Sequence, residues 1–505
     1  MPPGVIYASF DLAVPVVSNS GNIAFSSLVT GTGVTSVNNS AIYAGASDAP
    51  QLVARTGAPA HGLSPGVSYS EFLNTPNLND AGELTYGAIL AGSGVTSTND
   101  TAIYGGSVAA PLLIAREGDA VPGIGAIFGI LPSTPAISDA SHTAFVAHVI
   151  GLGVTSVNDR AILAGPLASP QVAVREGDPA LGMPPGVSYG DLITPPRIND
   201  SSQMAYRASL VGSGVTSSND TGLFLGTIGA AQLIAREGDP APSLPAGVNF
   251  SEFAPFTTLS LNDTGQVAFG AELVGSGVTS ANSRATYVGS PGALHLIARE
   301  GNAAPDTAAG VTYKGVGLPA TNDLSAVAYL ASLAGSGISS ANDEVIYAGP
   351  MDAPRLIARE GEPAPGTPPG MLYSQPISTV AINDLGQVAY LARLAVGGAE
   401  STVQGLFVFD PTMGTLLVAR QGAQFDVGDG ILRTISAVNI GFVAGKSDDE
   451  RTGLSSDGTL AFGLVFDDGA RGIFTAVVVP EPHPLSMLLV TFLAAKTLPG
   501  PRAAR

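Results

Sequence analysis

Seven arginines recur in one sequence context, at the end of apolar segments such as LIAR. Successive copies are 61, 59, 61, 63, 60 and 61 residues apart. The set is Arg55, Arg116, Arg175, Arg236, Arg299, Arg359 and Arg420. A guanidinium can bind an anion through paired contacts, or donate hydrogen bonds to backbone carbonyls. The set could therefore line an anion site or make a structural contact. Because every repeat must solve the same packing problem, we predict the structural role.

Metal binding is the next chemistry that the residue types allow. Turns such as NDTG at Asn262 and the segment DVGDG at Asp426 offer the oxygen ligands that Ca²⁺ prefers. None of them has the alternating acids of a calcium loop, so we predict that these side chains cap turns. The chain has no cysteine, which excludes thiolate ligands, disulfides and cysteine nucleophiles. We predict no metal or cofactor.

Catalytic motifs are also weak. The five histidines form no pair at i and i+4 around an acid, and the closest two, His142 and His148, flank an expected strand. The segment GFVAGKS from Gly441 has three residues between its glycines where a phosphate loop has four. No nucleophile elbow is indicated, because the GxSxG matches that begin at Gly62 and Gly186 lie in units with no expected helix. We therefore predict no catalytic residue. The acidic segment that follows Gly441 interrupts the repeat, so it could carry function or be a solvated insertion.

The elements that position these residues are short strands. Each unit of about 60 residues holds about four apolar segments bounded by Gly, Asn, Asp and Pro, as in FTTLSL, QVAFGAELVG, ATYVG and LHLIAREG. No segment has a sustained helical period. Such units predict an all-β fold, a β-propeller of about eight four-stranded blades, with seven blades or a β-solenoid as alternatives. We assign residues 1–476 to the propeller and 477–505 to a tail with a short apolar helix.

Closure of the ring raises a question about the ends of the chain. Three strand types occur eight times, but the arginine strand occurs seven times. The first residues, MPPGVIYASF, match the middle of a repeat, MPPGVSYGDL. We therefore predict an arginine strand upstream of Met1 that completes the last blade, preceded by a signal peptide. The alternative is a last blade of three strands.

Composition limits the partners. The 505 residues carry a formal net charge of −19, which would repel a nucleic acid backbone, so we expect no nucleic acid partner. A hydrophobic content of 45% is enough for a large core. A propeller that is an enzyme should have one asymmetric cluster of acids, tyrosines or histidines across neighbouring blades. This sequence instead repeats the same motifs from unit to unit, so we predict that the protein is not an enzyme.

The repeats resemble the bacterial NxxGxxAF tandem-repeat family, most literally at Asn262, Gly265, Ala268 and Phe269. The tail resembles a PEP-CTERM sorting signal at Pro480, Glu481 and Pro482. These resemblances imply a protein that is exported to the cell surface or beyond it and transiently anchored by its tail. They imply a sortase-like membrane transpeptidase as partner of the tail. We predict a non-enzymatic binding or structural module, whose ligand could be a surface polysaccharide or protein. The alternative is a propeller enzyme, a polysaccharide lyase or glycosidase.

Overall fold

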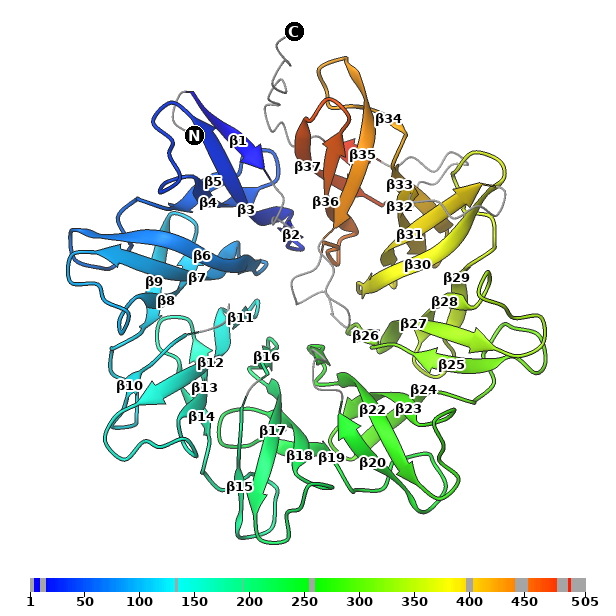
Figure 1. Ribbon diagram of the computed structural model, residues 1–505, viewed down its shortest axis with the longest axis horizontal. Helices are drawn as coiled ribbons and strands as arrows, with labels where there is room; N and C mark the ends of the chain where they lie inside the picture. The colour runs from blue at the N-terminus through cyan, green and yellow to red at the C-terminus, as the bar shows by residue number, and fades with distance from the viewer. Residues whose placement is uncertain are drawn as a thin grey trace.

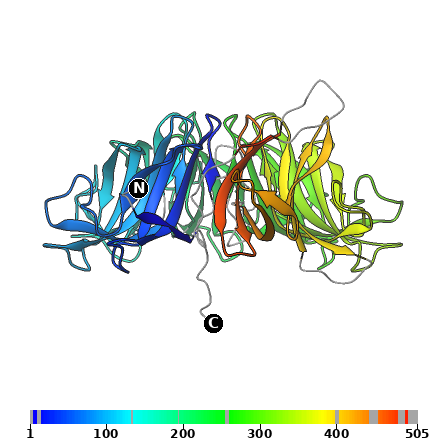
Figure 2. The ribbon, with the colours of Figure 1, turned by 90° about the horizontal axis from the view of Figure 1, so that it is seen from above.

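The strands form eight antiparallel sheets arranged around a central axis, as the blades of a propeller (Figure 1). The computed structural model describes residues 4–9, 15–131, 135–192, 194–253, 259–396, 403–440, 453–478 and 489–491. Within these ranges the chain has no helix. From the side, the molecule is a flattened disc (Figure 2). The predicted all-β propeller of eight blades is confirmed, and the seven-bladed and solenoid alternatives are excluded.

Blades are numbered here in chain order, and each is built from consecutive strands. Blade 1 contains β1 (Val5–Ser9), β2 (Val16–Val17), β3 (Asn22–Gly31), β4 (Ser40–Ala46) and β5 (Gln51–Arg55). Blade 2 contains β6 (Val67–Leu78), β7 (Glu83–Gly92), β8 (Thr101–Ser107) and β9 (Ala110–Arg116). Blade 3 contains β10 (Ile127–Phe128), β11 (Ala136–Ile137), β12 (His142–Ile150), β13 (Arg160–Pro166) and β14 (Gln171–Arg175). Blade 4 contains β15 (Val187–Tyr189), β16 (Arg197–Ile198), β17 (Met204–Gly212), β18 (Thr221–Gly226) and β19 (Gln232–Arg236).

The second half of the ring follows the same order. Blade 5 contains β20 (Val248–Phe253), β21 (Ser260–Leu261), β22 (Val267–Gly275), β23 (Arg284–Ser290) and β24 (Ala293–Arg299). Blade 6 contains β25 (Thr312–Val316), β26 (Ala320–Thr321), β27 (Ala326–Ala334), β28 (Glu344–Pro350) and β29 (Arg355–Arg359). Blade 7 contains β30 (Met371–Ile382), β31 (Val388–Val396), β32 (Val403–Asp410) and β33 (Gly414–Arg420). Blade 8 contains β34 (Gln424–Asp426), β35 (Leu432–Ile440), β36 (Thr459–Phe466), β37 (Arg471–Val477) and β38 (Leu489–Thr491).

The NDxG hairpins lie at the inner ends of the blades. In Figure 1 the short strands β2, β11, β16 and β26 lie nearest the centre, and each is followed directly by an NDxG turn or its Ser-containing variant. The predicted left-handed glycine is confirmed, since Gly265 has a φ of 77°. Ser202 takes the same place in blade 4 with a φ of 58°. The repeated hairpin therefore brings the same motif to the axis from every blade.

The arginine strands depart from simple alternation. In blade 5, Ala298 lies opposite Thr286 and Leu296 opposite Tyr287, so Ile297 falls in a β-bulge. All seven arginine strands have a register shift at the corresponding place. The alternation of side chains between the two faces of the strand is therefore interrupted between Leu296 and Arg299, because the extra residue re-aims the end of the strand.

The hydrophobic core lies between the blades. Each of its clusters combines side chains from two neighbouring blades, as where Leu223 of blade 4 packs with Phe250 and Tyr287 of blade 5. The ring closes in the same way, because Phe25 and Tyr43 of blade 1 share a cluster with Ala461 and Ile473 of blade 8. Blades 1 and 8 are thus joined by side-chain packing, and no strand passes from one to the other within the described residues.

The last blade is completed by a segment that we predicted as helical. Part of the apolar tail, Leu489–Thr491, forms β38 and pairs antiparallel with β37. The short helix is therefore wrong at these residues. The pairing also occupies the edge of β37 that we expected an upstream arginine strand to cover. A strand edge with unpaired amides favours such an addition.

Candidate functional site

Six of the repeated arginines make one and the same contact. The Nε of each donates to the backbone carbonyl of an asparagine 17 residues earlier, in the outer GVTSxN turn of its own blade. The pairs are Arg55–Asn38 at 2.6 Å, Arg116–Asn99 at 2.9 Å, Arg175–Asn158 at 3.0 Å, Arg236–Asn219 at 2.8 Å, Arg299–Asn282 at 3.0 Å and Arg359–Asn342 at 3.0 Å. Arg420 instead donates to the carbonyl of Gln421 at 3.0 Å. Six of the seven arginines thus hold the outer turns of blades 1 to 6 against the ends of those blades.

The asparagine of this turn shapes the loop with its side chain. In blade 5, the Oδ1 of Asn282 accepts from the amide of Thr279 at 2.7 Å, and its Nδ2 donates to the carbonyl of Gly277 at 3.0 Å. The backbone carbonyl of the same asparagine receives Arg299. One residue therefore satisfies the loop and the guanidinium together, which explains why the motif and the arginine recur as a unit.

The first asparagine of the NDxG motif links neighbouring blades. The Oδ1 of Asn322 accepts from the amide of Ala326 at 2.8 Å and closes its own hairpin. Its Nδ2 donates to the carbonyl of Asn383 in the next blade at 2.7 Å. Four further asparagines make the equivalent link, namely Asn79, Asn199, Asn262 and Asn383. All five are buried, so their amides lock the blades together rather than meet a ligand.

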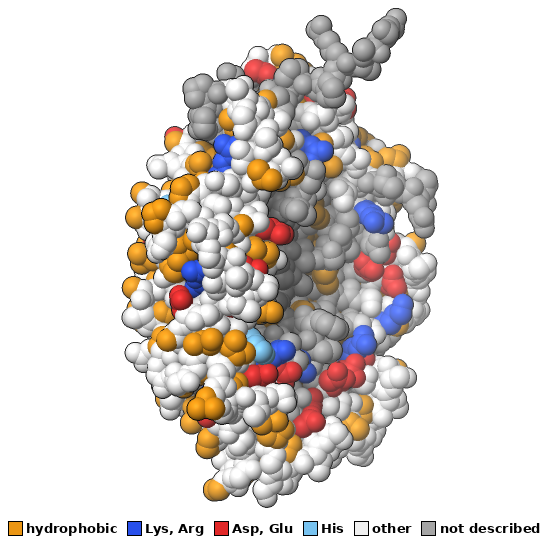
Figure 3. All heavy atoms as spheres, turned by 60° about the vertical axis from the view of Figure 1, so that its left-hand side comes forward, with side chains coloured by type: hydrophobic (Ala, Val, Ile, Leu, Met, Phe, Trp, Pro, Cys, Tyr) orange, Lys and Arg blue, Asp and Glu red, His pale blue; other side chains and the backbone are white. Residues whose placement is uncertain are grey.

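The second residue of the motif forms a closed ring of hydrogen bonds, the axial ring. Side chains at this position accept from a backbone amide of the preceding blade, and Asn19 of blade 1 accepts from Ser456 of blade 8. The ring consists of Asn19, Asp80, Asp139, Asp200, Asp263, Asp323, Asp384 and Ser456. Burial raises the pKa of Asp139 to about 7 and that of Asp263 to about 6, with neighbouring carboxylates adding to each rise. Acidic side chains are visible along the central hollow in Figure 3.

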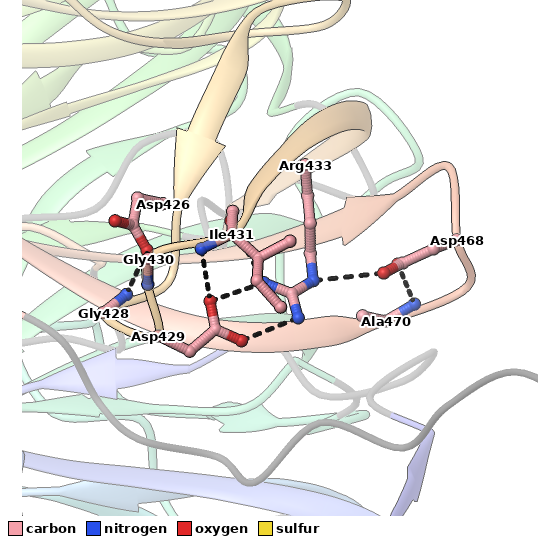
Figure 4. Close-up of polar contacts among 8 residues, drawn as sticks. All are labelled: Asp426, Gly428, Asp429, Gly430, Ile431, Arg433, Asp468 and Ala470. Atoms are coloured by element: carbon pink, nitrogen blue, oxygen red, sulfur yellow. Dashed lines mark hydrogen bonds and ion pairs between the residues drawn. The ribbon is translucent and has the colours of Figure 1, made fainter.

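The DVGDG segment is a capped and ion-paired loop (Figure 4). The Oδ1 of Asp426 accepts from the amides of Gly428 at 2.8 Å and Gly430 at 3.0 Å. Arg433 makes two contacts with the carboxylate of Asp429, at 2.9 and 2.8 Å, and its Nε donates to Asp468 at 3.1 Å. These contacts engage the carboxylates as turn caps and ion-pair partners. In the part of the chain that the structure describes, no group of three or more His, Asp or Glu side chains is placed to hold a metal ion.

One cavity breaks the symmetry of the repeats. It measures about 520 Å³ and lies between blades 3 and 4. Blade 3 contributes His148, Asp159 and Arg160, together with Glu176, which follows β14. Blade 4 contributes Asp191, which follows the short strand β15. The edge strands β10 and β15 of these two blades are two and three residues long, and the cavity lies beside the end of β15.

Two ion pairs organise the polar wall of this inter-blade cavity. His148 Nε2 lies 3.1 Å from Asp159 Oδ2, and Arg160 Nη1 lies 3.2 Å from Asp191 Oδ1. Both pairs are partly exposed, so each contributes little to stability. Glu176 is buried, and its carboxylate accepts from the amide of Arg160 at 3.1 Å. Because His148 pairs with Asp159 and Arg160 pairs with Asp191, no cationic side chain of this cavity is paired with the Glu176 carboxyl.

The ionisation of the cavity follows from this arrangement. Burial raises the pKa of Glu176 to about 7, helped by a hydrogen bond to Asp159 and by the charges of Asp191 and Asp159. Burial also raises the pKa of Tyr189. The Tyr189 hydroxyl lies 2.9 Å from that of Tyr206 and accepts from the amide of Leu181 at 3.0 Å. This tyrosine is therefore a core residue and is not available as a base.

The sequence singled out only one member of this cavity. That residue is His148, for which we predicted no catalytic role, and its partners Asp159, Arg160, Glu176 and Asp191 did not stand out in the sequence. A signal was present, because His148 lies opposite Arg160 across the hairpin. The corresponding pairs of the other blades differ: Leu28–Ser40, Ile89–Thr101, Ser209–Thr221, Glu272–Arg284, Ser332–Glu344 and Arg393–Gln404. A comparison of the repeats position by position could have found it.

The three other histidines within the described ranges do not line the cavity. His61 contacts the hydroxyl of Tyr69, His142 contacts Ser202 at 2.8 Å, and His295 is exposed. The predicted sorting residues Pro480, Glu481 and Pro482 lie outside the described residues, as does most of the insertion after Gly441. Among the described residues, no helix is long and apolar enough to span a bilayer.

The chain matches the model of one protein family. A family model matches residues 2–192 and 165–485, so the chain belongs to the family described as "Family of unknown function (DUF7453)". No curated protein matches the chain.

Solved structures with a similar course of the chain are remote. A puromycin hydrolase S511A mutant complexed with PGG is 12% identical, with a TM-score of 0.34, over 78% of this chain and 52% of that one. A puromycin-hydrolyzing peptidase of Mycobacterium tuberculosis is 12% identical, with a TM-score of 0.40, over 95% and 63%. The polysaccharide lyase Uly1 is 9% identical, with a TM-score of 0.36, over 92% and 96%. This chain therefore spans less than two thirds of either puromycin-hydrolysing protein.

Proposed function

We propose that this propeller is an exported, non-enzymatic binding module of the cell surface or extracellular matrix. The observation that carries the proposal is how the repeated polar residues are used. Arg299 holds its outer turn and Asn322 links neighbouring blades, and most of their counterparts do the same. The result is a rigid scaffold, and an asymmetric cavity lies between its blades 3 and 4. Ligand sites are concave and few per protein, so this cavity is the candidate binding site.

Export and anchoring rest on the resemblance of the repeats to NxxGxxAF proteins and of the tail to a PEP-CTERM signal. In this proposal a sortase-like membrane transpeptidase recognises Pro480, Glu481 and Pro482. Fractionation of cells that produce the chain with and without Glu481→Gln tests it. We expect the natural sequence at the surface or in the medium, and the variant retained in the membrane. Equal distribution of the two would contradict the role of the triplet.

Binding without turnover is tested with insoluble polysaccharides. We expect the purified chain to sediment with at least one polysaccharide of a varied panel, and no soluble sugar to be released. Release of reducing or unsaturated sugar would overturn the non-enzymatic proposal. Failure to sediment with any member would instead favour a protein ligand.

A second candidate function is suggested by the cavity itself. His148 beside Asp159, with the buried Glu176 nearby, is an asymmetric cluster of the kind expected of a propeller glycosidase or lyase. Tyr189 cannot serve as the base, because its hydroxyl is engaged in the core. If sugar is released, His148→Ala should abolish the release, and unchanged release would place the reaction elsewhere.

A further inference from the structure

The charged side chains of the inter-blade cavity favour a ligand with a positive charge. Three carboxyl groups, those of Asp159, Glu176 and Asp191, face one guanidinium, Arg160, and the imidazole of His148. Each of the two basic groups already has a carboxylate partner. An anionic ligand would be repelled by this excess of carboxyl groups and by the net charge of −19 on the chain. A cation would lie beside buried Glu176, whose carboxyl makes a strong charge-assisted contact when it is ionised.

The non-ionic part of the wall indicates what else the ligand carries. Val157 and Val211 line the cavity and are 71% and 50% exposed. Carboxylates, a guanidinium and the nearby Ser209 supply acceptors and donors for hydroxyl groups. The volume of about 520 Å³ falls within the usual range for small-ligand sites. A saturated ring with hydroxyl groups and an apolar face fits both kinds of surface.

We propose that the inter-blade cavity binds a polysaccharide segment whose sugars carry free amino groups. The protonated amine lies against Glu176 and Asp191, hydroxyl groups contact Arg160 and Asp159, and an apolar face of the ring lies on Val157 or Val211. The inference rests on the proposed function of the chain as a binding module, and it assigns that module an amino-sugar ligand.

Calorimetric titration with a glucosamine oligosaccharide tests the proposal. We expect binding by the natural chain and affinity lowered about tenfold or more by Glu176→Gln and by Asp191→Asn, since each removes a charged acceptor. The matched control is Glu237→Gln. Glu237 is the counterpart of Glu176 in blade 4, equally buried, with a pKa also raised to about 7 by burial, and it does not line this cavity. The control should bind as the natural chain does.

Two competing ligands and a stability measurement make the result decisive. The N-acetylated oligosaccharide keeps the ring and loses the charge, so it should bind at least tenfold more weakly. Spermidine keeps the charge and lacks the ring, and should also bind weakly. Equal affinity for either compound would overturn the proposal, as would an equal loss of affinity in Glu237→Gln. Melting curves of all variants identify any loss that comes from unfolding.

The outcome also separates this inference from the proposed function. Sedimentation with another polysaccharide that the Glu176 and Asp191 variants leave unchanged would overturn the amino-sugar site and keep the binding module. Release of sugar would overturn the binding module itself.

Discussion

Replacing Arg299 with alanine tests the structural role of the repeated arginines. Arg299 is only 9% exposed, and its Nε donates to the carbonyl of Asn282 at 3.0 Å. Hydrogen bonds that involve a charged group contribute about 1.5–3 kcal/mol. The substitution removes the donor and leaves the carbonyl of the turn without it. We therefore expect Arg299→Ala to lower the free energy of unfolding by about 2–3 kcal/mol.

Equilibrium unfolding in urea, followed by circular dichroism, measures this change. The matched control is Arg284→Ala in the same blade. The Arg284 side chain is 62% exposed and lies 3.4 Å from Glu272, so its loss should cost less than about 1 kcal/mol. Arg299→Lys should fall between the two variants, because an ammonium group cannot donate from the position of Nε.

Two results would refute this reasoning. One is an equal shift of the urea midpoint for Arg299→Ala and Arg284→Ala, which would show that the contact with Asn282 contributes nothing special. The other is an unchanged midpoint for Arg299→Ala together with a loss of anion binding. That combination would assign the arginines to an anion site instead of to the outer turns.

Three further predictions concern the axial ring, a close backbone contact and the last blade. Burial raises the pKa of Asp139 from 3.8 to about 7, so the folded chain holds this proton more tightly than the unfolded chain. The contribution of the protonated carboxyl to stability is therefore lost as the pH rises from 3.8 through about 7. The melting temperature should fall over this pH range, and it should fall less in Asp139→Asn. A Cβ at Gly275 would lie 1.9 Å from the carbonyl oxygen of Gly247, so Gly275→Ala should lower the urea midpoint strongly, whereas Gly277→Ala, with nothing within 4 Å, should cost only about 1–2 kcal/mol. Truncation before Leu489 removes β38 and exposes the edge of β37, and should increase light scattering at equal concentration; unchanged scattering would argue against the pairing.

The blade plan was predictable because the same local problem is solved eight times. Asparagine and glycine in NDTG specify a tight hairpin, and the short apolar segments on either side specify strands. A period near 60 residues then limits the architecture to a few repeat folds. The role of Arg299 could be inferred from recurrence alone. Its acceptor could not, because Asn282 is 17 residues away and is brought close by the hairpin and the bulge.

The candidate site depends on contacts that the local sequence does not encode. His148 and Arg160 meet because β12 and β13 pair in one register, and Asp191 reaches Arg160 because blade 4 packs against blade 3. The tail shows the same limit. Its apolar run is compatible with a helix or a strand, and the free edge of β37 decided for a strand at Leu489–Thr491.

The sequence by itself determined the all-β class and the repeat period, and it indicated about eight blades, because turn chemistry and strand pattern act over a few neighbouring residues. The tertiary structure decided how the ring closes and where its symmetry breaks. The amide of Ser456 donates to Asn19, which lies 437 residues earlier in the chain. The cavity lies between blades 3 and 4, beside the short strand β15. Both depend on the rotation and packing of entire blades, which no single repeat specifies.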